Sequence, residues 1–247
     1  MSTAEAFADL PEALATKARD SLAVLRAAQQ AHGRLTYSNS LGAESMVLTD
    51  LLWGFLDDVD IFSLDTGRLP AQTYELVERL EARYGRRLRL VFPAAEDVEA
   101  WVAANGINGF VNSVEARRGC CHVRKVLPFR RAVAGFGAWI TGVRREQSAT
   151  RAQAVTVEFD AGNGLHKVSP LLEWTHQDVW AYIRLRKLPY NPLHDRGYPS
   201  IGCAPCTRAI EPGEDSRAGR WWWENTGNKE CGLHPSSRGH GLSSALL

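Results

Sequence analysis

The stretch Leu35-Thr-Tyr-Ser-Asn-Ser-Leu-Gly-Ala-Glu-Ser45 decides the fold class, because it reads as a short strand, a loop of small residues and the start of a helix. Apolar residues continue as far as Phe55 and predict that this helix covers about residues 44–55. The same succession follows, with a strand over 59–64, a break at 65–67 and a helix over about 71–84. Strands that alternate with helices predict a parallel α/β sheet flanked by helices, with right-handed crossovers.

Further elements extend this pattern in both directions along the chain. They are an N-terminal amphipathic helix ending at Gly33, strands at 88–92 and 138–141, helices at 122–133 and 174–187, and a β-hairpin between 155 and 168. Beyond Pro189, Pro, Gly, Asn and Asp dominate, so regular structure thins out. We expect one α/β domain over 1–247, with a core at about 34–190 and an irregular C-terminal cap at about 190–247.

The charge of the chain is balanced overall but uneven locally. Of its 247 residues, 29 are Lys or Arg and 28 are Asp or Glu, and 45% are hydrophobic, which is enough for a sizeable core. A net charge of +1 gives no general argument for a polyanionic partner. Residues 116–151, however, hold nine Lys and Arg against Glu146 alone, a local charge of +8. This stretch is either a solvated helix face or a pocket for a multiply charged anion.

Membrane and export signals are not evident in the sequence. The longest apolar run, residues 46–56, spans 11 residues and includes Thr49 and Asp50, whereas a bilayer needs roughly 20. The N-terminus lacks the order of charges and apolar residues that marks a signal peptide. We therefore expect a cytoplasmic protein in a reducing compartment, where cysteines serve as metal ligands or reactive thiols more often than as disulfides.

Four of the five cysteines form two pairs, Cys120-Cys121 and Cys203-Ala-Pro-Cys206. The first pair is predicted at the start of a helix, where the helix dipole, Arg124 and Lys125 would stabilise thiolates. Three interpretations compete: an iron–sulfur cluster, a zinc site and inert buried thiols. Adjacent cysteines strain tetrahedral closure around one zinc ion, whereas a cluster offers each thiolate its own iron, which favours the cluster. Lys125, four residues after Cys121, would lie on the same helical face.

The fifth cysteine, Cys231, stands alone near the C-terminus. Lys229 and His234 flank it and could support a thiolate, and Gly232 gives its backbone freedom. A nucleophile on a mobile segment would need these features, although a lone cysteine in a tail is more often incidental.

Two further loops are candidate anion sites. Ser38, Ser40 and Gly42 belong to the loop that precedes the helix at 44–55, where backbone N–H groups and hydroxyls can bind a phosphate. The loop is not a Walker A sequence, because no Gly-Lys-Ser/Thr follows, and a structural turn remains the alternative. Arg144 ends Thr141-Gly-Val-Arg144, which follows a predicted strand at the edge where α/β sheets bind ligands.

Several rare strings carry a family resemblance over about residues 37–234. They are Leu64-Asp-Thr-Gly67, Cys120-Cys121 with Arg124-Lys125-Val126, Thr141-Gly-Val-Arg144 with Gln147-Ser148, Ile201-Gly-Cys-Ala-Pro-Cys-Thr-Arg208, Gly213-Glu-Asp-Ser-Arg-Ala-Gly-Arg-Trp-Trp-Trp223 and Glu230-Cys-Gly-Leu-His234. With these strings the sequence resembles the assimilatory sulfonucleotide reductases, and among them the cluster-containing adenylyl-sulfate reductases of the phosphoadenylyl-sulfate reductase family.

This resemblance implies a fold like that of the PP-loop ATP pyrophosphatases, also called adenine nucleotide alpha hydrolase-like, with residues 38–45 as a modified phosphate loop. The nucleotide-hydrolysing relatives have Ser-Gly-Gly-Lys-Asp-Ser there; this chain lacks the central Gly and Lys, which fits a substrate that keeps its AMP intact. It also implies a role for each matching residue. Cys120, Cys121, Cys203 and Cys206 would bind a [4Fe-4S] cluster in the C-terminal cap, Cys231 would be the nucleophile on a mobile catalytic segment, and Leu64, Asp65, Thr66, Gly67, Lys125, Arg144, Arg151, Arg217 and Arg220 would surround the substrate.

The implied reaction is the reduction of adenosine 5′-phosphosulfate to sulfite and AMP through an S-sulfocysteine, with thioredoxin or a glutaredoxin-like dithiol donor, in sulfate assimilation. Alternatives are a 3′-phosphoadenylyl-sulfate reductase with the same chemistry, a PP-loop ATP-dependent adenylyltransferase, and a nucleic-acid-binding module that stacks bases on Trp221-Trp-Trp223. We expect neither a nucleic acid nor a membrane as partner, and the resemblance leaves a homo-oligomer open.

Overall fold

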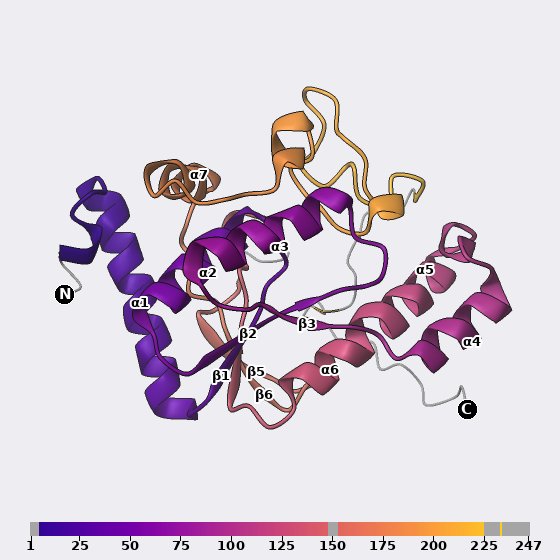
Figure 1. The fold of residues 1–247 in the computed structure, drawn as a ribbon, viewed down its shortest axis with the longest axis horizontal. Coiled ribbons are helices and arrows are strands. Elements are labelled where there is room, and N and C mark those ends of the chain that lie inside the picture. Colours follow the sequence, from indigo (N-terminus) through magenta and orange to yellow (C-terminus); the bar gives the residue numbers. More distant parts are fainter. Residues whose placement is uncertain (1–4, 148–152, 225–232, 234–247) are drawn as a thin grey trace.

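The computed structural model describes residues 5–147, 153–224 and 233, and shows an α/β sheet with helices on both faces (Figure 1). Within this part of the chain the sheet has six strands in the order β3-β2-β1-β4-β6-β5. All neighbours pair in parallel except β5 and β6, which form the predicted antiparallel hairpin. The strands are β1 (Leu35–Ser38), β2 (Val59–Leu64), β3 (Arg89–Val91), β4 (Ala138–Ile140), β5 (Val157–Asp160) and β6 (Leu165–Val168). The predicted parallel sheet is confirmed.

Seven α-helices flank the sheet in the described residues. They are α1 (Glu12–His32), α2 (Ala43–Phe55), α3 (Ala71–Tyr84), α4 (Ala95–Asn105), α5 (Val114–Cys121), α6 (Leu127–Val133) and α7 (His176–Leu185). Buried residues of α1, α2, α3 and α7 form one core with inward residues of the sheet such as Tyr37 and Ile140. Phe129 of α6 packs on the opposite face, against Phe62 and Trp139. Neighbouring residues of β2 and β4 thus reach different cores, with Ile61 and Ile140 in one and Phe62 and Trp139 in the other.

The direction of chain growth reverses between β1 and β4. From β1 the sheet extends to β2 and β3, and the chain then returns to add β4 and β6 on the other side. In parallel sheets the loops that leave the two central strands at such a reversal diverge and form a crevice at the carboxyl ends. The crevice is therefore bounded by the loop after β1, which begins at Asn39, and the loop after β4, which begins at Thr141.

The region between β3 and β4 differs from the sequence prediction, which leaves 93–121 unassigned and places one helix at 122–133. The structure has α4 and α5 there, then a five-residue π-helical turn, His122–Val126, and only then α6. No residue of α4, all of which the structure describes, is fully buried, and its apolar stripe is limited to the partly buried Val98, Trp101 and Val102. In the π turn the N–H of Leu127 bonds to the carbonyl of His122, and Pro128, which has no N–H, starts α6.

The residues after α7 form the irregular C-terminal cap that the sequence predicts, drawn in orange to yellow in Figure 1. Its regular structure in the described part is limited to short 3₁₀ turns at Pro192–Arg196 and Ala204–Cys206 and a bridge between Thr207 and Arg220. No helix in the described residues is both long and apolar enough to cross a membrane.

Two stacked histidines at the amino ends of the strands give a prediction about stability. The rings of His32 and His166 lie 4.0 Å apart between centroids, at 22°. Burial, and then the like charge of His166, lower the pKa of His32 from its usual 6.5. The unfolded chain therefore binds more protons than the folded one as the pH falls through and below about 6.5, and stability is lost there. We expect His166→Gln to reduce the fall in melting temperature between pH 7 and pH 5; equal falls in variant and wild type would contradict this.

Candidate functional site

A cavity of about 960 Å³ occupies the crevice at the carboxyl ends of the strands. The loops after β1, β2 and β4 form its floor, and residues of α7 and the C-terminal cap form its sides. Of the residues predicted to bind substrate, the cavity is lined by Ser38, Ser40, Gly42, Leu64, Thr66, Lys125, Arg144, Arg217 and Arg220. Most of the predicted substrate residues are thus brought together, although they come from five separate segments of the chain.

The loop after β1 is held in place by side chains that bond to its own backbone. The Asn39 carbonyl oxygen accepts from the N–H of Leu41 (2.8 Å), which has a left-handed φ of 58°, and the Asn39 amide donates to Thr49 of α2 (2.9 Å). The Ser45 hydroxyl accepts from the N–H of Ser40 (3.1 Å) and shares a hydrogen bond with the Ser40 hydroxyl (2.9 Å). The loop therefore holds its shape at the N-terminus of α2 without the glycines and lysine of a phosphate loop.

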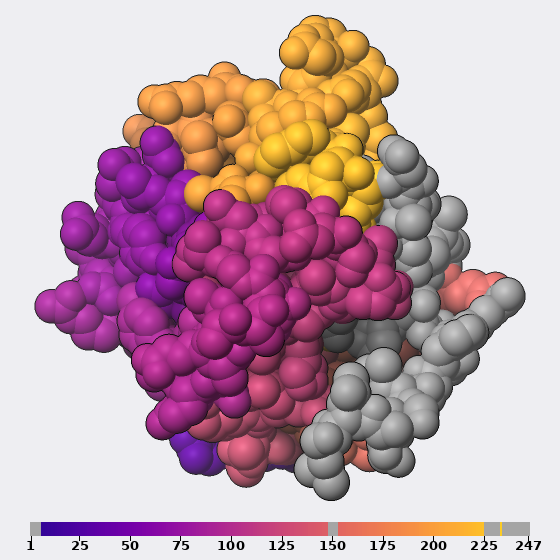
Figure 2. All heavy atoms as spheres, turned by 90° about the vertical axis from the view of Figure 1, so that its right-hand side faces the viewer, coloured from indigo at the N-terminus to yellow at the C-terminus, as the bar shows by residue number. Residues whose placement is uncertain are grey.

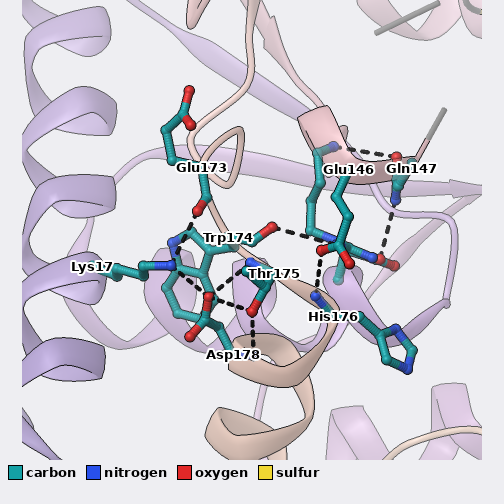
Figure 3. A network of polar contacts seen from close by, with 10 residues as sticks. Lys17, Glu146, Gln147, Glu173, Trp174, Thr175, His176 and Asp178 are labelled. Atoms are coloured by element: carbon teal, nitrogen blue, oxygen red, sulfur yellow. Dashed lines mark hydrogen bonds and ion pairs between the residues drawn. The ribbon is translucent and has the colours of Figure 1, made fainter. Parts of the chain in front are cut away.

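Arg144 lines the cavity but its charge is already matched by carboxylates. Its guanidinium donates to Glu44 (2.9 Å) and to Glu146 (3.1 Å), and its side chain is only 6% exposed. Gln147 also donates to Glu44 (3.1 Å), and the N–H of His176 donates to Glu146 (2.9 Å), as Figure 3 shows for Glu146, Gln147 and His176. Sequence reasoning misses the pairing of Arg144 with Glu44, because nothing in local spacing pairs residues 100 positions apart.

The loop after β2 sends its residues in different directions. Leu64 and Thr66 line the cavity, whereas Asp65 and Gly67 are not among its lining residues. The Asp65 carboxylate accepts from the N–H of Gly67 (2.8 Å) and from the Tyr74 hydroxyl (2.9 Å). Burial, and then the bond to Asp65, raise the pKa of Tyr74 to about 12, so this hydroxyl remains a donor at neutral pH. Asp65 and Gly67, predicted to surround the substrate, therefore shape the loop instead of lining the cavity.

The four paired cysteines are all buried and line a second, much smaller cavity. Phe110 and Trp221 complete its apolar walls. This cavity lies where the α4–α5 region meets the C-terminal cap, the magenta and yellow surfaces that adjoin in Figure 2. In the part of the chain that the structure describes, no three His, Cys, Asp or Glu side chains are arranged to hold a single metal ion.

The sequence predicts Cys120 and Cys121 at the start of a helix, and this is wrong. They are the last two residues of α5, and the π turn follows them. The helical backbone continues through the π turn into α6, and its N-terminus at Val114 lies six residues before Cys120, beyond the first turn in which the helix dipole would stabilise a thiolate. Positive side chains act instead. Burial alone would raise the pKa of Cys203, but Lys125, the Thr66 hydroxyl, Arg220 and Arg124 lower it.

The pKa values of the other cysteines follow from burial. Burial, and then the charge of Cys203 and Cys121, raise the pKa of Cys206 to about 12. Burial also raises the pKa of Cys120, against the opposing charge of Arg124. Four such thiols cannot all ionise unless positive charge joins them.

Lys125, Arg220 and Trp221 line both cavities and form the wall between them. The predicted link between the cysteine site and an anion site through Lys125 thus has a geometric basis. Arg124, which precedes Lys125 in the same π turn, makes a different contact: it donates to the carbonyl of Thr66 (2.7 Å).

Trp221 is clamped in this wall. The guanidinium carbons of Arg117 and Arg220 lie 4.6 Å and 4.7 Å from the centroid of its ring system. Arg117 in turn makes a buried two-pronged ion pair with Glu224 (2.8 and 2.9 Å). The backbone of Trp221 is left-handed, with a φ of 43°, a conformation that a bulky residue adopts only under firm restraint. Of the three tryptophans predicted as a possible platform for nucleic-acid bases, Trp221 is 1% exposed and cannot stack a base, whereas Trp222 is 44% exposed.

The structure describes little of the chain beyond Glu224. Leu233 lines the large cavity and packs against the core that contains Phe129 and Trp139. The predicted nucleophile Cys231, its neighbours Lys229 and His234, and Arg151 lie outside the described residues.

Known proteins resemble the chain in sequence. Residues 34–209 match the family model described as "Phosphoadenosine phosphosulfate reductase domain". The adenosine 5′-phosphosulfate reductase of Burkholderia cepacia is 51% identical over 95% of this chain and 93% of its own length, and that of Allochromatium vinosum is 54% identical over 81% and 78%.

Solved structures resemble the chain in fold. The phosphoadenylyl-sulfate reductase of Candida auris, in a phosphate complex, superposes with a TM-score of 0.66 and 27% identity, covering 81% of this chain and 98% of that one. The FMN adenylyltransferase of Candida glabrata with ATP, at 15% identity and a TM-score of 0.57 over 81% of this chain and 66% of that one, shares the fold alone.

Proposed function

The chain belongs to the phosphoadenosine phosphosulfate reductase family, and on that premise we propose that it reduces adenosine 5′-phosphosulfate to sulfite and AMP in assimilatory sulfate reduction. The observation that carries the proposal is the shared wall: Lys125 and Arg220 line both a nucleotide-sized cavity and the four-cysteine cavity. Two relatives about 50% identical to the chain over most of its length are adenosine 5′-phosphosulfate reductases.

A [4Fe-4S] cluster is the group we propose for Cys120, Cys121, Cys203 and Cys206. The residues fit it in their chemistry, because four buried cysteines line one small cavity. Lys125, Arg124 and Arg220 would offset the charge of four thiolates, which their burial otherwise opposes. When bound, the cluster would join α5 to the C-terminal cap and contribute charge beside Lys125, without having to change its oxidation state.

The phosphosulfate would lie against Lys125, Arg217 and Arg220, three cations that line the large cavity. Aimed at the bridging oxygen, they would stabilise the negative charge that develops there as the bond to sulfur breaks. Arg144 would serve this site indirectly, because its ion pair with Glu44 ties the loop after β4 to α2.

Cys231 is the proposed nucleophile. Leu233, two residues later in the sequence, lines the same cavity, which supports this assignment. The Cys231 thiolate would attack the sulfate sulfur; an S–S bond would form, the S–O bond to phosphate would break, and AMP would leave with its electron pair. The product on the chain is an S-sulfocysteine, which Lys229 and His234 would help to form by favouring the thiolate of Cys231.

A separate dithiol protein, thioredoxin or a glutaredoxin-like donor, would complete the reaction. Its first thiolate would attack Sγ of Cys231 and expel sulfite with the electron pair of the S–S bond. Its second thiolate would then break the resulting mixed disulfide and return the Cys231 thiolate. The donor is oxidised to a disulfide by two electrons, and the sulfur of the substrate is reduced by the same two.

A second candidate is the reduction of 3′-phosphoadenylyl sulfate, favoured by the superposition on the Candida auris enzyme. Steady-state kinetics with thioredoxin decide between the two. We expect kcat/KM for adenosine 5′-phosphosulfate to exceed that for the 3′-phosphorylated nucleotide by on the order of 100-fold, because the relatives about 50% identical to this chain are adenosine 5′-phosphosulfate reductases. The opposite preference would overturn the assignment, and pyrophosphate release from ATP would indicate an adenylyltransferase instead.

A further inference from the structure

A hydroxyl on α3 braces the loop after β2. The Tyr74 hydroxyl donates to Oδ1 of Asp65 (2.9 Å), and the same oxygen accepts from the N–H of Gly67 (2.8 Å). Asp65 is buried, while the Tyr74 ring is 37% exposed. Gly67 has a left-handed φ of 70°, so the chain turns sharply at the residue whose N–H binds the Asp65 carboxylate. The brace thus ties the turn to α3, whose Thr73 lines the large cavity while Tyr74 itself lines neither cavity.

The braced loop touches both cavities at once. Its Thr66 lines the large cavity, and the Thr66 hydroxyl lies 3.2 Å from Sγ of Cys203, with which it shares a hydrogen bond. Two residues further on, the carbonyl of Arg68 accepts from the N–H of Ala204 (2.8 Å), next to the same cysteine. Movement of this loop would therefore change the floor of the nucleotide cavity and the surroundings of Cys203 together.

We propose that Tyr74 is a positioning residue whose hydroxyl, acting through Asp65, holds this loop in register with both the nucleotide and Cys203. The inference rests on the proposed function, because it takes the large cavity to bind the nucleotide. It adds a residue that contacts neither substrate nor cysteine ligand. It also gives Asp65 a role in the site, that of holding the loop, although Asp65 does not line the large cavity.

A hydrogen bond that only stabilises the fold should affect the melting temperature but not ligand binding. The chain offers a second tyrosine–aspartate pair that can serve as the control. Tyr84 lies on the same helix and donates its hydroxyl to another buried carboxylate, that of Asp50 (2.7 Å). Neither Tyr84 nor Asp50 lines either cavity. Tyr84→Phe therefore removes the same kind of hydrogen bond from the same helix, away from the site.

The test compares Tyr74→Phe with Tyr84→Phe in the full-length, iron-loaded protein. AMP affinity is measured by titration calorimetry, and iron release to a chelator is followed anaerobically with and without AMP. We expect Tyr74→Phe to weaken AMP binding by about tenfold, the worth of one hydrogen bond to a charged group. We also expect faster iron release that AMP no longer slows. Tyr84→Phe should lower the melting temperature but leave both readouts within about twofold of wild type, as additive, distant sites do.

Two results would overturn the inference. One is AMP affinity and iron release in Tyr74→Phe that match wild type, and the other is equal changes in the two variants, which would make the brace merely structural. In both cases wild-type protein binds AMP and iron, so the proposed function stands. Failure of wild-type protein to bind AMP would instead overturn the proposed function, and this inference with it.

Discussion

Cys231→Ser abolishes sulfite production, with a fall in turnover of at least about 10⁴-fold, while AMP binding and iron content stay at wild-type levels. The size of the loss follows from the chemistry: a serine hydroxyl is not ionised at neutral pH and cannot accept a sulfonate that a dithiol later removes. The binding groups Lys125, Arg217 and Arg220 remain in the cavity wall, so affinity for the nucleotide persists.

The measurement is a single turnover with adenosine 5′-[³⁵S]phosphosulfate and no reductant. Wild-type protein should retain label in a form that thioredoxin releases as sulfite, and Cys231→Ser should retain none. Ser236→Ala, five residues later in the sequence and not one of the proposed cluster ligands, is the comparison for effects of altering this segment. Sulfite formation by Cys231→Ser at a rate near that of wild type would remove Cys231 from the mechanism.

Cys203→Ser loses iron and stability together. Cys203 is the cysteine whose pKa the surrounding cations lower in spite of burial, and Thr66 and the neighbouring Ala204 connect it to the loop after β2. A serine there removes a ligand from the proposed cluster and leaves buried cations around an incomplete site. Because binding of such a group is part of folding free energy, its loss should destabilise the protein by several degrees or more.

Iron and acid-labile sulfide per chain, visible absorbance and melting temperature are measured side by side. Wild-type protein should be brown with about four irons per chain, and Cys203→Ser should be colourless and melt earlier. Cys231→Ser is the control, since it should retain colour and iron. A Cys203→Ser protein that lacks iron yet turns over like wild type would contradict any role for the cluster.

Local patterns in the sequence predict the parts of the fold that local physics determines. The alternation at 35–64 predicts β1, α2 and β2 because each needs only its own periodicity and a turn between them. Helix α4 escapes prediction because none of its described residues is buried. The π turn also escapes, since an added residue in a helix changes neither composition nor overall length noticeably.

The candidate site shows a sharper limit. Spacing identifies the cysteine pairs, but only tertiary structure shows that residues 80 positions apart share a cavity. The local charge of +8 at 116–151 is also less available than it looks in the sequence. Arg117, Arg144 and Arg145 are each paired with a carboxylate from another part of the chain, which are Glu224, Glu44 and Glu173 respectively. Counting charges along a sequence cannot reveal such pairings, so it overstates the free positive charge of a site.

The π turn at His122–Val126 limits where insertions and deletions can occur in the chain. Each residue of an α-helix advances the side chains by about 100° around the axis. Deleting one residue from the turn would restore ordinary helical phase, but it would rotate Cys120 and Cys121 by that angle relative to Phe129, which is fixed in the core below. Lys125 would then no longer face both cavities. Insertions and deletions should therefore be tolerated in the exposed loops but selected against at this turn. Here the helical phase sets how the cysteines and Lys125 are oriented relative to Phe129 in the core.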